Sequence, residues 1–363
     1  MATVSDDASL DPTKVGLFAF QVFSKLEGAV TAGMIHLGDR LGLYRALAEA
    51  GEPLSTTALA DRLGFHERWV REWAYNQAAA HVIEIDADEC VSLSPEAVAV
   101  LASPDHPAFG MGSFHHLPQT MATLERLPEA FRSGLGLAYD EHGSECAEGI
   151  ARGFEPWMRA NLVEVVLPAL EGVTDKLAAG ARAADVGCGA GGVALLVAST
   201  FPASEIWGYD ISQHALEQAR ARQADAAITN AHFLDPRASP LPADASLDLV
   251  TTFDCMHDMT HPASVMAAIR AALADDGTWL LVDIKAHDTF ADNAQRNPMA
   301  SLMYGVSVLS CMSSALSEPD GAGLGTLGLS AARAEQMARD AGFTRFRRLD
   351  IDHPINAFYE IRP

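Results

Sequence analysis

Hydrophobic positions in the first hundred residues recur at helical spacing. Residues 12–32 carry an apolar stripe with few polar residues beside it, made of Val15, Phe18, Val22, Phe23 and Leu26. A helix this apolar is expected to pack against another domain or another subunit. Further helices are predicted at 34–50, 55–64 and 66–80, and two short strands at 81–85 and 90–93. Three helices followed by a two-stranded wing predict a winged-helix module.

From residue 181 the pattern changes to short apolar strands that alternate with amphipathic helices, which predicts βαβ units and a parallel sheet. The expected strands are 182–187, 206–210, 231–234, 247–253, 278–284, 346–351 and 356–362. The expected helices lie near 191–200, 212–223, 262–275 and 330–342. Only four residues separate the last two strands, too few for a crossover, so these strands must pair antiparallel.

The predicted fold class is therefore α/β, a Rossmann-like seven-stranded sheet with an antiparallel last strand, preceded by a mainly α-helical winged-helix domain. We place the winged helix at 1–105, a helical bridging segment at 106–179 and the α/β domain at 180–363. Within the last domain, residues 285–329 form a long insert with an apolar helix expected at 297–315.

The net negative charge of the chain disfavours nucleic acid as a binding partner. The 363 residues hold 48 Asp and Glu against 25 Lys and Arg, a formal charge of −23, and a field of this sign repels nucleic acid. Residues 1–110 carry 16 acids against 7 bases, so the winged helix lacks the basic face that reads DNA.

Other composition features favour a cytoplasmic protein. No apolar run approaches the ~20 residues of a membrane span, and the acidic N-terminus lacks the features of a secretory signal. Five scattered cysteines without a C-x-x-C pair indicate reduced thiols rather than a disulfide or zinc framework. No metal-ligand pattern is evident, so we expect no metal.

The stretch AADVGCGAGG carries the chemistry of the second domain. Gly187, Gly189 and Gly192 satisfy the dinucleotide pattern G-x-G-x-x-G, and Asp210 follows where a ribose-binding acid is expected. Asp185 decides against that interpretation, because a buried carboxylate beside a pyrophosphate would repel it. S-adenosylmethionine has no phosphate and carries an ammonium and a sulfonium group, so an acid at this position suits it. Asp185, Gly187, Gly189 and Gly191 thus form the methyl-donor version of the turn.

At these residues the chain resembles the class I S-adenosylmethionine-dependent methyltransferases over its whole second domain. DVGCGAGG resembles their first motif, GYDIS (208–212) the second and AHFLDPRASPLP (231–242) the third. LDLVTTFDCMHD (247–258) and LADDGTWLLVD (273–283) resemble the motifs of strands four and five. The resemblance implies that Asp210 binds the ribose hydroxyls and Asp235 the adenine amine. It makes Ile211 and Phe253 further candidate cofactor contacts.

With the winged helix, the resemblance narrows to small-molecule O-methyltransferases that dimerise through that domain, which implies a homodimer. The chain is most similar to an uncharacterised bacterial group that shares VREWxxxQAAA and FDCxHDM. The 285–329 insert departs from the better-understood O-methyltransferases and leaves the acceptor undetermined.

His257, in FDCMHDM, is the candidate catalytic residue. It follows strand four at the carboxyl edge of the sheet, where doubly wound folds bind ligands. Plant phenol O-methyltransferases resemble this sequence there and use the histidine of a similar His-Asp pair as general base. Asp258 is expected to orient the ring or to cap the next helix. The competing interpretation is a surface histidine that begins that helix.

The expected activity is methyl transfer to a small-molecule acceptor, at a hydroxyl oxygen. Candidate acceptor contacts are His115, His116, His142, Met303 and Tyr304, for which exposed loop or core roles stay open. The alternatives are an N- or C-methyltransferase on the same fold, for which His257 would matter little, and a winged-helix regulator that only senses the cofactor.

Overall fold

The computed structural model describes residues 10–363, which form two compact units. One unit runs to Ser103 and includes Phe109–Phe114, and the other comprises Pro104–Ala108 and His115–Pro363. Within residues 10–363, no helix has both the length and the apolar character needed to cross a membrane.

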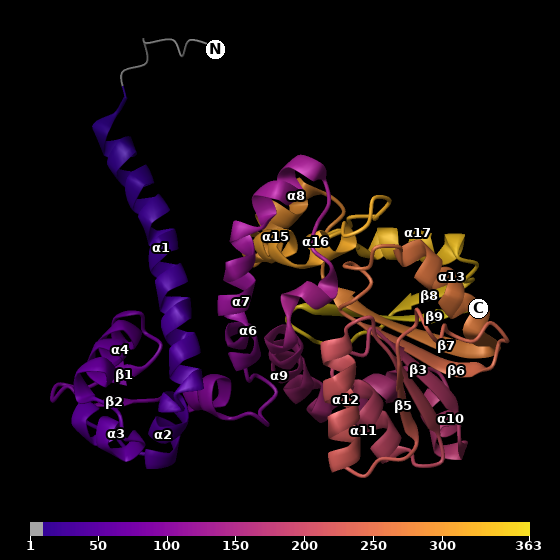
Figure 1. Cartoon of the computed structure of the whole chain (residues 1–363), viewed down its shortest axis with the longest axis horizontal. Coiled ribbons are helices and arrows are strands. Elements are labelled where there is room, and N and C mark those ends of the chain that lie inside the picture. Colours follow the sequence, from indigo (N-terminus) through magenta and orange to yellow (C-terminus); the bar gives the residue numbers. More distant parts are fainter. Residues whose placement is uncertain (1–9) are drawn as a thin grey trace. The chain divides into compact units, whose positions relative to one another are not determined.

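The first unit is a winged-helix fold, as the sequence predicted (Figure 1). Its elements are α1 (Pro12–Arg40), α2 (Leu43–Ala50), α3 (Thr56–Leu63), α4 (Glu67–Ala79), β1 (Glu84–Ile85), β2 (Val91–Ser92), α5 (Pro95–Ala97) and η1 (Val98–Ala102). The predicted break near residue 33 is wrong, because α1 continues through Gly33 to Arg40. The helix ends where Gly42 adopts a left-handed conformation with φ of 71°. The wing pairs only two residues on each strand, fewer than expected.

The core of the first unit is closely packed where α1 meets α2 and α4. Tyr44 is 1% exposed and Trp73 6% exposed, and Trp73 Nε1 donates to the Met34 carbonyl at 2.9 Å. A Cβ at Gly38 would lie 2.6 Å from the Tyr44 ring, so glycine permits this close approach.

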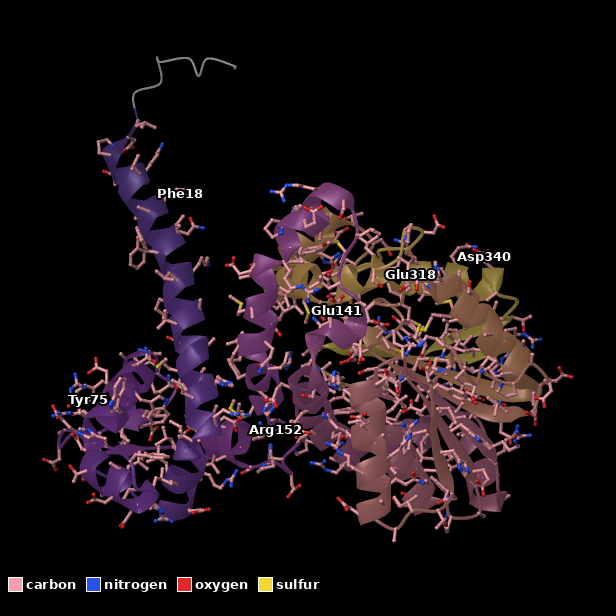
Figure 2. All side chains as sticks on the ribbon, in the orientation of Figure 1. Phe18, Tyr75, Glu141, Arg152, Glu318 and Asp340 are labelled. Carbon is pink, nitrogen blue, oxygen red and sulfur yellow. The ribbon has the colours of Figure 1, made fainter. Side chains whose placement is uncertain are left out.

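The first half of α1 leaves its apolar side chains uncovered within the unit. Phe18 is 66% exposed and Figure 2 shows its ring projecting from the helix. The side chains in this segment that are at least 53% exposed are Leu17, Phe18, Phe20, Val22, Phe23 and Leu26.

The second unit begins with a helical segment. It contains α7 (Leu117–Ala122), η2 (Thr123–Glu125), α8 (Leu127–Ser133), η3 (Tyr139–His142), α9 (Ser144–Asn161), η4 (Leu162–Val166), η5 (Leu167–Ala169) and α10 (Val173–Ala179). The short helix α6 (Met111–His115) lies at the boundary between the units.

A seven-stranded sheet in the order β5-β4-β3-β6-β7-β9-β8 follows, and it confirms the predicted fold class. Its strands are β3 (Arg182–Val186), β4 (Glu205–Tyr209), β5 (Ala231–Leu234), β6 (Leu247–Phe253), β7 (Leu273–Ile284), β8 (Arg345–Arg348) and β9 (Asn356–Arg362). Strands β3 to β7 pair parallel, and β9 enters antiparallel between β7 and β8. Strand β7 begins earlier than predicted and β8 ends earlier.

Helices cover both faces of this sheet (Figure 1). Residues of α10, α11 (Gly192–Thr200) and α12 (Gln213–Asp225) belong to one apolar core, which includes Leu177, Val197 and Leu216. Residues of α13 (Pro262–Ala272) and α17 (Ala331–Asp340) belong to a second core, which includes Ile269 and Trp279. Burial on both faces explains why the parallel strands are continuously apolar.

The insert folds into α14 (Phe290–Arg296), α15 (Ala300–Leu309) and α16 (Cys311–Ala315). The single helix expected at 297–315 is therefore wrong. Ser310, with φ of −138° and ψ of −79°, breaks it and starts a new helix at Cys311.

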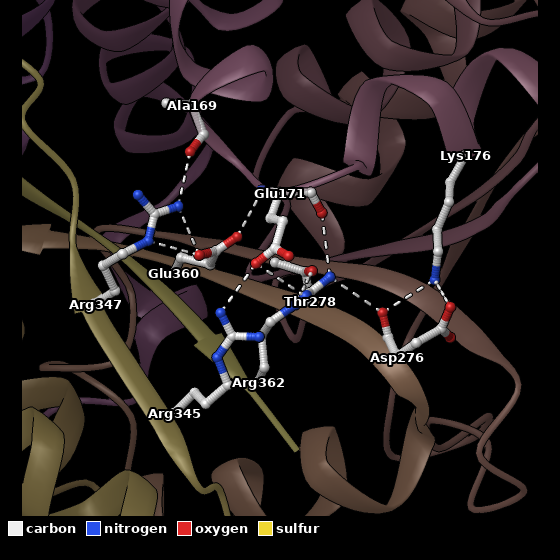
Figure 3. A network of polar contacts seen from close by, with 9 residues as sticks. All are labelled: Ala169, Glu171, Lys176, Asp276, Thr278, Arg345, Arg347, Glu360 and Arg362. Atoms are coloured by element: carbon white, nitrogen blue, oxygen red, sulfur yellow. Dashed lines mark hydrogen bonds and ion pairs between the residues drawn. The ribbon is translucent and has the colours of Figure 1, made fainter.

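A network of hydrogen bonds and ion pairs connects Glu171, which follows η5, to residues of β8 and β9 (Figure 3). Glu360 is 2% exposed, accepts from the Glu171 backbone N–H at 2.7 Å and pairs with Arg347 at 2.6 Å. Glu171 in turn pairs with Arg345 at 2.9 Å. These residues therefore join the chain just before α10 to β8 and β9.

Candidate functional site

The glycine turn follows β3 at the carboxyl edge of the parallel strands. Asp185, the second-last residue of β3, is 3% exposed, and the Thr251 hydroxyl on β6 donates to its Oδ1 at 2.7 Å. Burial raises the pKa of Asp185 to about 7, against the Thr251 hydrogen bond, which lowers it, and with the Asp210 charge, which adds to the rise. A cation bound beside this carboxyl group would favour its ionised form.

Three glycines give the turn its shape. Gly187, Gly189 and Gly191 have φ of 74°, 52° and 80°, in the left-handed region that other residues rarely adopt. A Cβ at Gly191 would lie 2.7 Å from the Phe233 ring, so glycine is also required for packing. Nothing lies within 4 Å of a Cβ built on Gly189, so a ligand has room to approach the backbone there.

Asp210 follows β4 and holds this turn in place. Its Oδ2 accepts from the Gly189 N–H at 2.8 Å, and its Oδ1 accepts from the Ser212 N–H at 2.8 Å. The residue is 8% exposed, and burial raises its pKa although these hydrogen bonds oppose the rise. Ile211 beside it is 44% exposed, which leaves an apolar surface next to the turn.

The remaining predicted cofactor residues differ in their surroundings. Phe253, at the end of β6, is 8% exposed and its ring packs edge-on against Phe154 with centroids 5.5 Å apart. Asp235 is already engaged, because Arg237 pairs with its Oδ2 at 2.7 Å and Gln213 donates to the same oxygen at 2.9 Å. The Arg237 hydrogen bond lowers the pKa of Asp235.

His257 lies in the turn after β6 and is buried. It is 2% exposed, and its Nδ1 is 2.6 Å from Oδ1 of Asp283, which is also 2% exposed. The interpretation of His257 as a surface histidine is therefore wrong. The structure also gives the orienting role to Asp283 rather than to Asp258, the neighbour expected from the sequence.

Two opposing effects set the charge of His257. Burial lowers its pKa, but Asp283 and, to a smaller extent, Cys311 raise it by more, and the resulting pKa lies well above the ordinary value. Oδ1 of Asp283 also accepts from the Ile284 N–H at 2.7 Å, while its Oδ2 is buried without a hydrogen-bond partner in the described chain.

Two more carboxyl groups surround His257. Burial raises the pKa of Asp254 and of Asp258 to about 7 each. Tyr139 is half-buried, and desolvation raises its pKa, as do the nearby Cys146, Asp258 and Asp210.

The predicted acceptor contacts do not form one group. His142 Nε2 lies 3.4 Å from the Ser314 hydroxyl, and its ring packs edge-on against Tyr139. His115 instead contacts Arg152 at 2.7 Å and Glu145 at 3.2 Å. His116 is half-buried, and its charge lowers the pKa of His142.

The predicted contacts on the insert lie elsewhere. Met303 is half-buried on α15, and Tyr304 packs against Phe290 with centroids 5.6 Å apart. Tyr304 lines a cavity of about 320 Å³ whose lining includes His287 and Arg333 but none of the glycine turn or His257.

Sequence reasoning missed Asp283 and Thr251. Asp283 is the second-last residue of β7, as Asp185 is of β3, so the repeated placing of acids near strand ends was an available signal. No cluster of histidine, cysteine, aspartate or glutamate within residues 10–363 is arranged to hold a metal ion.

Comparison with known proteins gives a match within each of the two units. Residues 177–342 match the model of a methyltransferase domain, and residues 29–103 match an Rv2258c-like winged helix-turn-helix domain. No protein of curated function is similar enough in sequence to match.

Solved structures share the whole architecture. Mitomycin 7-O-methyltransferase MmcR is similar over 97% of this chain and 100% of its own, with a TM-score of 0.68 and 19% identity. A putative O-methyltransferase from Nostoc punctiforme covers 98% and 100%, with a TM-score of 0.72 and 17% identity. Human N-acetylserotonin methyltransferase, solved in complex with SAM, covers 99% and 99%, with a TM-score of 0.63 and 17% identity.

The residues of the turn fit this cofactor. A buried carboxyl group suits a cationic ligand, and the open space at Gly189 allows a ligand to approach the backbone. The second unit thus matches a methyltransferase domain in sequence and shares the fold of solved methyltransferases.

Proposed function

We propose that this S-adenosylmethionine-dependent methyltransferase transfers the methyl group to a hydroxyl oxygen of a small-molecule acceptor, with His257 as general base. The observation that carries the proposal is the buried contact of 2.6 Å between His257 Nδ1 and Asp283 Oδ1. A carboxylate at Nδ1 leaves Nε2 as the nitrogen that accepts a proton, and it stabilises the imidazolium that forms.

The glycine turn and its acids would hold the cofactor. In the proposal, Asp185 and the backbone near Gly189 hold the charged tail, Asp210 the ribose and Ile211 one face of the adenine. Asp235 is the predicted contact of the adenine amine, and its carboxylate is at present paired with Arg237. When bound, the cofactor supplies an electrophilic methyl group.

The chain's own residues then have two tasks. A phenol has a pKa near 10 and is a poor nucleophile at pH 7, so a base that accepts its proton is worth typically 10²–10⁴-fold. In the proposal the neutral form of His257 accepts this proton at Nε2; because the pKa of His257 is raised, this form is the minor one at pH 7. The site also orients the acceptor and excludes water, which contributes several kcal/mol through proximity. Asp283 keeps the ring oriented and carries the balancing negative charge.

The test compares His257→Gln with His261→Gln. His261 is a matched control because it lies four residues further along, is exposed and pairs with Glu318. With a panel of phenols and mass detection of the products, H257Q should lower kcat by at least about 100-fold. Its cofactor affinity should stay within about threefold of the wild type, and H261Q should leave both unchanged.

Two alternatives have distinct outcomes. An N- or C-methyltransferase would retain nearly the full rate in His257→Ala, because such acceptors need no oxygen deprotonated. A regulator that only senses the cofactor would bind duplex DNA in a gel shift at low salt. The acidic balance of residues 1–110 disfavours that outcome.

We further propose that two copies associate through the apolar face of α1 in the cytoplasm. Six large apolar side chains from Leu17 to Leu26 are each at least 53% exposed, and exposed apolar side chains gathered on one segment are typical of an association surface. Analytical ultracentrifugation should give a dimer for the wild type and a monomer for the double variant Phe18→Ser, Val22→Ser. A monomeric wild type at micromolar concentration would refute this.

A further inference from the structure

The second unit contains a cavity of about 320 Å³ that the proposed reaction does not use. We call it the insert cavity, because its walls come from the segment after β7, from α14 and α15, and from the start of α17. Neither the glycine turn nor His257 lines it. Sites that hold small molecules range from about 300 to 1,000 Å³, so this volume suits a small ligand.

One wall of the insert cavity is held in a fixed shape by a buried amide. Asn293 is 2% exposed, and its Oδ1 accepts from the His287 N–H at 2.9 Å. Its Nδ2 donates to the carbonyl oxygens of His287 at 3.0 Å and of Thr289 at 3.1 Å. The path of the chain from His287 to Thr289 is therefore set before any ligand binds, which lowers the entropy lost on binding.

Two residues of opposite charge line the insert cavity, and Ser330 joins the segments that carry them. Asp288 lies after β7, and Arg333 lies in the first turn of α17. The Ser330 hydroxyl donates to Asp288 Oδ1 at 2.5 Å and accepts from the Arg333 backbone N–H at 3.4 Å. Ser330 is 6% exposed, so this connection is shielded from water. An acid and a base thus face the same small space.

These two charges are not used by the protein itself. The nearby pairs Arg296–Asp292 and Arg339–Glu335 lie within single helices. In the part of the chain that the structure describes, by contrast, no acid pairs with the Arg333 guanidinium and no base pairs with the Asp288 carboxylate. Both groups are therefore available to a ligand.

Aromatic rings supply the apolar part of the lining. The rings of Phe290 and Tyr304 have centroids 5.6 Å apart and planes inclined by 53°. Phe290 is 72% exposed although its side chain is large and apolar, so much of its ring surface is not covered by the protein. Aromatic rings pair favourably at centroid distances of about 4.5–7 Å, so this pair can accept a third ring.

We propose that the insert cavity binds a free aromatic α-amino acid. The ligand's carboxylate pairs with the Arg333 guanidinium, and its ammonium group pairs with the Asp288 carboxylate. Its ring packs against Phe290 and Tyr304. A ligand with only one charge would leave one of the two protein charges unpaired and be repelled by it, so the site discriminates against simple acids and simple amines. This binding site is separate from methyl transfer and does not depend on the proposed function.

The experiment titrates the full chain with L-phenylalanine at pH 7 in a calorimeter. Three further compounds each lack one feature of this probe: 3-phenylpropanoate lacks the ammonium group, 2-phenylethylamine lacks the carboxylate and L-alanine lacks the ring. Each should bind at least tenfold more weakly than L-phenylalanine. The proposal is overturned if L-phenylalanine shows no saturable binding at millimolar concentration, or if any of the three compounds binds as tightly.

Variants assign the two charges. Arg333→Gln should weaken L-phenylalanine at least tenfold and change 2-phenylethylamine less than twofold. Asp288→Asn should weaken L-phenylalanine at least tenfold and leave 3-phenylpropanoate no weaker, while the amide oxygen can still accept from Ser330. The matched control Arg339→Gln lies on the same helix, pairs with Glu335 and does not line the cavity, so it should bind as the wild type does.

Two results on the variants would overturn the proposal. One is wild-type affinity for L-phenylalanine in R333Q or D288N, when an unchanged melting temperature shows that the variant is folded. The other is loss of binding in His257→Gln with full binding in R333Q, which would place the amino acid beside His257 instead. If methyl transfer to oxygen is never found, these titrations still decide the proposal.

Discussion

Cofactor affinity is predicted to depend on pH through Asp185. In the free protein, burial raises the pKa of this carboxyl group to about 7. If the cationic cofactor binds only the ionised form, about one-tenth of the sites are competent at pH 6 and about nine-tenths at pH 8. The dissociation constant should therefore fall about tenfold between these pH values, which corresponds to about 1.4 kcal/mol.

Asp185→Asn removes the charge and keeps the shape. A hydrogen bond to a charged group contributes roughly 1.5–3 kcal/mol, so affinity at pH 8 should fall about 10- to 150-fold. The variant should also lose the tenfold dependence on pH. Isothermal titration calorimetry with S-adenosylmethionine at pH 6, 7 and 8 measures both effects, and buffers of different ionisation enthalpy count the protons released.

Asp254→Asn is the matched control. Burial raises the pKa of Asp254 to about 7 as well, but the charges that act on it are Asp283, His257 and Asp258. Its φ of 50° is one that asparagine tolerates. This variant should keep the pH dependence of cofactor binding. Equal wild-type affinity at pH 6 and pH 8, or a tenfold slope that persists in D185N, would refute the reasoning.

Further predictions concern stability and the turn. Because the folded pKa of Asp185 is raised above its unfolded value, its stabilising contribution is lost as pH rises from about 4 to about 7. The melting temperature of D185N relative to ligand-free wild type should therefore increase over that window, and a constant difference would contradict this. Gly191→Ala should destabilise the fold by more than about 2 kcal/mol in urea denaturation, because its Cβ would lie 2.7 Å from Phe233. Gly189→Ala meets open space and should cost only about 1 kcal/mol, yet it should abolish cofactor binding, and a variant that binds normally would exclude Gly189 from the site. Glu360→Gln should cost about 1–3 kcal/mol, because it weakens a buried pair with Arg347, and an unchanged urea midpoint would show that the network carries no stability.

The sequence predicted the fold because its determinants are local. Glycine spacing, strand length and the short connection before β9 each act within a few residues, so the glycine turn and the antiparallel strand could be derived without coordinates. The winged helix followed for the same reason. The end of α1 was misplaced because Gly33 stays helical, whereas Gly42 adopts the left-handed conformation that ends a helix.

The partners of His257 could not be derived in this way. Asp283 is separated from it by 26 residues and meets it only because β6 and β7 pair in register, with Phe253 opposite Val282. Sequence adjacency favoured Asp258 instead. The break at Ser310 is marked by neither glycine nor proline in the sequence, so the division of the helix expected at 297–315 could not be derived from local propensity.

The position of β9 has a consequence for how the protein is made. Residues 356–362 bond to β7 on one side and to β8 on the other, so this late segment is an interior member of the sheet. A ribosome must translate past Arg362 before β7 and β8 acquire the neighbour that joins them. A transcript truncated before Asn356 would yield a polypeptide with two unpaired edges, which proteolysis or aggregation would remove.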